Sequence, residues 1–204
     1  KVFFFFFLLV VLAAPAFAES VKNSKHNLST SGSGSVKSTN YDQICVFCHT
    51  PHFANTSVTD APLWNRGVIT GAGLTPYYNS STLDAYSGTA QVDVDSTDAP
   101  LCLSCHDGSS LAGQLQNPAN LAGGVRPSFP TGNDTVSTEA DILDGSNGLS
   151  NDHPIGFDYS DAMVTADGEL RAYATVTGAG ITFYEGSRAF WCSTCHDVHN
   201  DENN

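Results

Sequence analysis

Regular alternation of hydrophobic and polar positions is rare along this chain. Residues 53–98 and 111–150 are rich in Ser, Thr, Asn, Asp and Gly, and they follow neither a helical nor a strand period. The clearest alternation runs from Leu170 to Val176 and resumes from Ile181 to Tyr184, with Gly178-Ala179-Gly180 near the middle. This order predicts a small β-hairpin near the C-terminus. The remainder is predicted to be mostly irregular and loop-rich, with short helices.

The strongest hydrophobic stretch lies at the N-terminus. Val2 to Ala14 is an unbroken apolar run, and Pro15 and Ala16-Phe17-Ala18 follow it in the pattern of a signal-peptidase site. Residues 1–18 are therefore predicted to be a cleaved signal peptide, and residues 19–204 to form a single domain. A retained anchor helix is the alternative. The run is short for a bilayer span and Pro15 interrupts it, so we expect no stable membrane span.

One five-residue pattern, Cys-x-x-Cys-His, occurs three times and contains every cysteine of the chain. It is the attachment signature of c-type haem. Residues i and i+3 are neighbours on a helical turn, so both thiols reach one porphyrin edge and the next histidine reaches the iron. The sequence thus predicts three covalently bound haems c. The thioether residues would be Cys45, Cys48, Cys102, Cys105, Cys192 and Cys195, and the proximal ligands His49, His106 and His196.

A zinc site and a redox dithiol are the alternative interpretations of this pattern. Structural zinc takes four protein ligands, commonly from two Cys-x-x-Cys knuckles, but these copies lie far apart in the sequence. A thioredoxin-like dithiol needs no histidine after the second cysteine and sits beside a βαβ pattern, which the chain lacks. Covalent haem is therefore favoured at all three copies.

The remaining histidines are candidates for the second axial position of each iron. Three irons need three further ligands, and four histidines remain: His26, His52, His153 and His199. Because Pro51 turns the chain after the first motif, His52 is expected to serve a neighbouring haem or none. We expect either His52 or His199 to be idle. The chain has one methionine, Met163, so all three irons are predicted to be bis-histidine.

Composition and charge narrow the class of protein. Hydrophobic residues make up 41% of the chain, so we expect a core built around the three haems and a poorly folded apoprotein. The formal net charge is −13, which disfavours nucleic acid and anionic membranes as partners. Six-coordinate iron has no open position for a substrate. We therefore expect an electron-transfer protein with no catalytic residues, not an enzyme.

Four segments resemble the multihaem c-type cytochromes with a doubled Cys-x-x-Cys-His arrangement. The segments are Lys25 to Ser29, Cys45 to His52, Asn151 to Phe157 and Cys192 to His199. With few haems for its length, the chain is similar to the subunits of extracellular cytochrome filaments, or nanowires. This resemblance implies head-to-tail polymerisation, His26 as a ligand to a haem of the adjacent subunit, and redox proteins or extracellular acceptors as partners.

Three other functions remain open from the sequence. A monomeric periplasmic or cell-surface electron shuttle would use the same ligands, and an extracellular or cell-surface location is the first expectation for either carrier. A reductase subunit would need an iron with an open position. A structural or sensor protein would use haem only as a staple.

Overall fold

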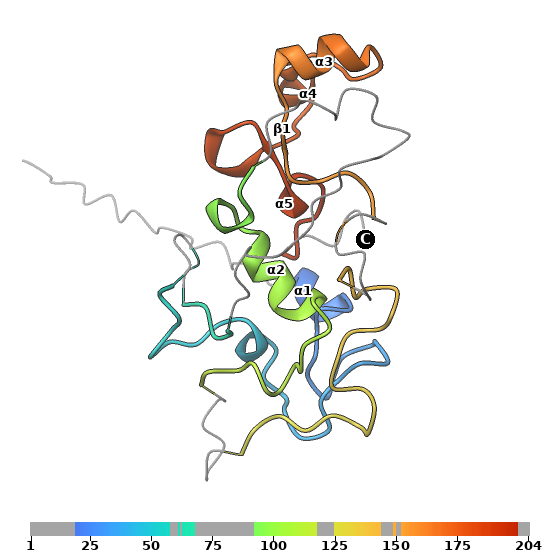
Figure 1. Cartoon of the computed structure of the whole chain (residues 1–204). Coiled ribbons are helices and arrows are strands. Elements are labelled where there is room, and N and C mark those ends of the chain that lie inside the picture. Colours follow the sequence, from blue (N-terminus) through green and yellow to red (C-terminus); the bar gives the residue numbers. More distant parts are fainter. Residues whose placement is uncertain are drawn as a thin grey trace, which may run out of the picture.

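The computed structural model describes residues 19–57, 61, 63–67, 92–117, 125–143, 149 and 152–199, so the predicted signal peptide lies outside the described residues. The fold is loop-rich, with short helices and one small antiparallel sheet, as the sequence predicts (Figure 1). No helix in these ranges is long and apolar enough to cross a membrane. The elements are α1 (Glu19–Asn23), η1 (Cys45–Phe47), η2 (Val94–Ser96), α2 (Ala99–His106), β1 (Phe157–Asp158), α3 (Asp161–Asp167), α4 (Tyr173–Gly178), η4 (Tyr184–Gly186), β2 (Ala189–Phe190) and α5 (Cys192–Cys195).

The elements are spread along the length of the molecule, but not in chain order, since α1 lies beside α2 in the middle (Figure 1). Helices α3 and α4 lie at one end, α2 and α5 lie in the middle, and the loops around η1 lie at the other end (Figure 1). Each region has its own small hydrophobic cluster. Their buried members are Phe157, Tyr159 and Met163 at the first end, Val94, Ala99, Leu103, Leu149, Ile155, Ala189 and Trp191 in the middle, and Tyr41, Val46, Phe47 and Leu115 at the other end.

Helix α2 is built by local capping and by one buried face. The Thr97 hydroxyl accepts the Ala99 N–H at 3.2 Å, and Pro100 occupies the first turn, where its missing N–H is not needed. Leu103 points into the middle cluster and is buried. Just beyond the helix, Gly108 has a φ of +73°, which turns the chain away. The second Cys-x-x-Cys-His motif therefore lies on a helix that is fixed at the centre of the molecule.

The predicted hairpin over 170–184 is wrong. Tyr173–Gly178 is the helix α4, and the two strands that pair are β1 and β2, with Phe157 opposite Phe190. The alternation of Leu170 to Val176 suggested a strand, but Tyr173 and Val176 are also three residues apart, which is the spacing of one helix face. Both pack against the Met163 cluster, so tertiary contacts decide in favour of the helix.

A glycine brings β1 close to the third motif. Gly156 has a φ of +82° and donates its N–H to the Phe190 carbonyl at 2.9 Å. A Cβ at this position would lie 3.2 Å from two carbons of the Trp191 indole. Trp191 directly precedes α5, so this close approach links the His153 segment to the third motif.

Gly156→Ala is expected to destabilise the fold by about 2–4 kcal/mol, because it adds a left-handed alanine and a tight contact with Trp191. Gly132→Ala is the matched control, since Gly132 has a similar φ of +85° but open space around it. The control should lose only about 1–2 kcal/mol. Urea unfolding of both variants measures the difference, and equal losses would show that the indole contact has no cost.

Candidate functional site

The first motif lies on η1 and the residues just after it. The Cys48 and His49 N–H groups both donate to the Cys45 carbonyl, at 3.1 and 2.7 Å, which closes a tight turn. Phe47 within the turn is buried in the third cluster. The His49 backbone pairs with Trp64, whose ring lies edge-on to the His49 ring at 6.0 Å between centroids.

The third motif lies on α5, which is only four residues long. The Thr194 hydroxyl accepts the Trp191 N–H at 3.1 Å, and the Thr194 N–H donates to the Trp191 carbonyl at 2.9 Å. The His196 N–H donates to the Cys192 carbonyl at 2.9 Å. All three motifs thus occupy helical turns, as the sequence predicts, and this geometry brings both thiols of each motif to one side.

Each motif histidine faces one histidine from elsewhere in the chain. His49 faces His199 with 6.2 Å between ring centroids, and the rings are 26° from parallel. His106 faces His26 at 6.2 Å, with 54° between the rings. The third pair is His196 and His153, at 6.4 Å and 31°. Three of the four predicted distal candidates are thereby each brought to a different motif.

His52 and Met163 lie elsewhere. The His52 side chain is exposed, and among the described residues no histidine ring is placed opposite it. Its carbonyl accepts the Thr50 hydroxyl at 2.9 Å, which holds the turn after the first motif. Met163 is buried in the cluster of Phe157 and Tyr159.

The spacing of the histidine pairs fits an iron between the two rings. A metal–imidazole bond is about 2.0 Å and the ring centroid lies about 1.1 Å beyond the nitrogen, so two imidazoles on opposite sides of one metal have centroids about 6.2 Å apart. The observed separations are 6.2, 6.2 and 6.4 Å. By contrast, the stacked pair of Phe157 and Phe190 has its centroids at 4.8 Å.

The surroundings of His106 and His26 suit neutral metal ligands. His106 Nδ1 lies 2.6 Å from the Ala140 carbonyl, a contact that requires a proton on Nδ1 and leaves Nε2 free to accept a metal. The His26 side chain touches solvent, yet desolvation lowers its pKa, and the neighbouring His106, His196 and His199 lower it further. His26 therefore lies close to histidines of all three pairs.

The cysteines also place the three motifs beside one another. Burial raises the pKa of Cys48 to about 12, and the nearby Cys105 acts in the same direction. A hydrogen bond with Cys192, together with burial, raises the pKa of Cys102. The six cysteines are free thiols with no disulfide between them. The second motif is thus adjacent to the first through Cys48 and to the third through Cys192.

Two buried indole N–H groups lie beside the first and third motifs. Trp64 Nε1 and Trp191 Nε1 are buried and have no hydrogen-bond partner among the described residues. Buried polar groups normally have a partner, so an acceptor that belongs to a bound group is a reasonable complement. Together with the histidine pairs and the grouped thiols, these donors fit three haems, each of which would be held by its motif and one further histidine.

The zinc alternative receives no matching geometry. In the part of the chain that the structure describes, no three His, Cys, Asp or Glu side chains are grouped closely enough to hold a bare metal ion. Six of the seven histidines come together in three pairs, and each pair includes the histidine of one Cys-x-x-Cys-His motif.

The sequence alone did not reveal Arg66, which joins the first two motifs. Arg66 is fully buried and donates to the Ser104 carbonyl and to the Leu111 carbonyl, each at 2.9 Å. Its neighbour Asn65 donates its backbone N–H to the Cys48 carbonyl at 2.8 Å. The available signal was a lone basic residue directly after Trp-Asn in an acidic chain.

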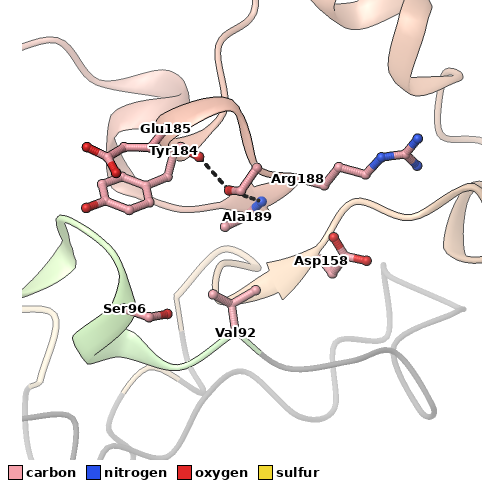
Figure 2. A pocket seen from close by; sticks show the side chains of 8 residues that line it. Val92, Ser96, Asp158, Tyr184, Glu185, Arg188 and Ala189 are labelled. Carbon is pink, nitrogen blue, oxygen red and sulfur yellow. Dashed lines mark hydrogen bonds between the residues drawn. The ribbon is translucent and has the colours of Figure 1, made fainter.

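A hollow of about 330 Å³ lies between η2, β1 and β2 (Figure 2). Arg188 extends away from it and pairs with Asp161 at 3.0 Å, with its guanidinium over the Tyr173 ring at 4.5 Å. At the rim of the hollow, the Ala189 N–H donates to the Ser187 hydroxyl at 3.0 Å. Among the residues that the structure describes, no histidine or cysteine lines the hollow.

No protein-family model and no curated protein matches this chain.

Proposed function

We propose that this protein is an exported electron-transfer cytochrome that holds three covalently attached haems c. The observation that carries the proposal is that every motif histidine faces one other histidine at a spacing suited to an iron between them. We name the three haem positions by their motifs. Site 1 comprises Cys45, Cys48, His49 and His199; site 2 comprises Cys102, Cys105, His106 and His26; site 3 comprises Cys192, Cys195, His196 and His153.

When bound, a bis-histidine haem supplies one-electron transfer at low potential. The residues of the chain would set the position and the surroundings of each haem. Two thioethers and two imidazoles would hold each macrocycle, the Ala140 carbonyl orients His106, and the surroundings of Cys48 and Cys105 are desolvated enough to raise the pKa of both thiols. A histidine pair would supply two ligands to each iron and would leave no place for a substrate. This arrangement favours a carrier over a reductase subunit.

The histidine pairs also bear on the choice between filament and shuttle. All three pairs form within one chain, so each site is complete without a second subunit. His26, predicted to reach an adjacent subunit, faces His106 of its own chain. Self-contained sites favour the monomeric periplasmic or cell-surface shuttle. A head-to-tail extracellular filament stays a proposal that would need contacts other than shared ligands, and negative-stain microscopy of the purified protein distinguishes the two.

The proposal is tested by comparing His26→Ala with His52→Ala. Both histidines have exposed side chains, but only His26 faces a motif histidine. His26→Ala should convert one of three low-spin ferric centres to high spin, whereas His52→Ala should leave all three low-spin, as measured by electron paramagnetic resonance. An intact mass that lacks three macrocycles in the wild type would overturn the proposal, as would a high-spin centre produced by His52→Ala.

A further inference from the structure

We infer that the segment Cys192–His199 ligates two sites at once, so that site 1 keeps its second histidine only while site 3 is loaded. This inference rests on the proposed function. Neither the motifs nor the number of histidines indicates this dependence of site 1 on site 3.

Two of the histidines that pair with other histidines lie on one short segment. His196 faces His153, and His199, three residues later, faces His49. Three residues of extended chain span at most about 10 Å. Sites 1 and 3 are therefore neighbours, although their motifs are far apart in the sequence.

The segment Cys192–His199 has few contacts of its own that fix it in place. A four-residue helix such as α5 has no stability of its own. Within the chain, the start of α5 is held by the buried Trp191 that precedes it and by the Thr194 cap on Trp191. Beyond it, the His199 N–H donates to the Asp197 carboxylate at 2.9 Å, a local turn in which both residues are exposed. Thioether bonds at Cys192 and Cys195 would be the strongest attachment of this segment.

The other two distal histidines, His26 and His153, lie next to buried residues. His26 is followed by Asn27, which is fully buried and donates to the Lys22 carbonyl at 2.8 Å. His153 precedes Ile155, which is buried in the middle cluster. These two ligands are positioned by their own surroundings. His199 instead ends a run of exposed residues that begins at Cys195, so loss of the thioether at Cys195 would loosen this run and draw His199 away from site 1.

The experiment measures how many equivalents of carbon monoxide the reduced protein binds. Carbon monoxide binds ferrous haem only where an axial position is free, so the uptake gives the number of irons that lack a second histidine. The wild type, with three macrocycles, should bind none. His199→Ala should keep three macrocycles and bind one equivalent, at site 1. The double variant Cys192→Ala/Cys195→Ala should carry two macrocycles and also bind one equivalent, because site 1 loses His199 without any change to its own residues. Adding His26→Ala to this double variant should raise the uptake to two equivalents.

The outcomes separate this inference from the function on which it rests. If the wild type lacks three macrocycles by mass spectrometry, the proposed function fails. If His199→Ala binds one equivalent but Cys192→Ala/Cys195→Ala binds none, the function stands and the dependence of site 1 on site 3 is overturned. If the double variant does not accumulate, the single variant Cys195→Ala is tested in its place. It keeps one thioether, at Cys192, and loosens α5. This variant should bind more carbon monoxide than the wild type, and equal uptake would overturn the inference.

Discussion

Replacing Cys102 and Cys105 by alanine is expected to give a chain with one macrocycle fewer that no longer unfolds cooperatively. Helix α2 contacts both η2 and α5, and its cysteines lie beside Cys48 and Cys192. A haem at this position would cover on the order of 400 Å² of apolar surface, worth roughly 10 kcal/mol. That is comparable to the whole stability of a domain. Intact mass and urea unfolding followed by circular dichroism measure both effects.

The matched comparison is Cys45→Ala/Cys48→Ala, which also removes one macrocycle. The first motif lies on the three-residue η1 near one end of the molecule, and Cys45 is exposed. Its loss should leave the middle cluster folded and retain a cooperative transition at lower urea. A site-2 variant with three macrocycles, or one that is as stable as the site-1 variant, would contradict the central position that we assign to α2.

Arg66→Met is expected to destabilise the fold by about 3 kcal/mol, because it leaves buried carbonyls without a donor. The Arg66 side chain is fully buried, with its Nε 3.2 Å from the Ser104 hydroxyl and its other donors on the Ser104 and Leu111 carbonyls. Methionine fills a similar volume but donates no hydrogen bond. Urea unfolding at fixed haem content measures the change.

Arg126→Met is the control for this prediction. Arg126 also donates to two carbonyls, those of Ala112 and Leu115, at 2.9 and 2.6 Å, but it is exposed, so water can replace it. Its loss should cost only about 1 kcal/mol. Equal effects of the two substitutions would show that burial of Arg66 adds nothing to the connection between the first two motifs.

Short-range features of the fold could be predicted because they depend on neighbouring residues. The helical turns at the three motifs and the irregular segments between them follow from cysteine spacing and from the Ser, Gly and Asn content. The error at Leu170 to Val176 has the same origin. A short segment there satisfies a strand period and a helix period equally, and the contacts of Tyr173 and Val176 with the Met163 cluster decide.

The sequence by itself determined the three Cys-x-x-Cys-His motifs and how many imidazoles are available, because cysteine spacing and histidine number are properties of the chain. Only the tertiary structure decided which imidazole lies opposite which motif. His49 meets His199 and His106 meets His26 across long stretches of sequence, while His52, three residues from His49, meets neither. The path of the loops sets these pairs, and no local period encodes that path.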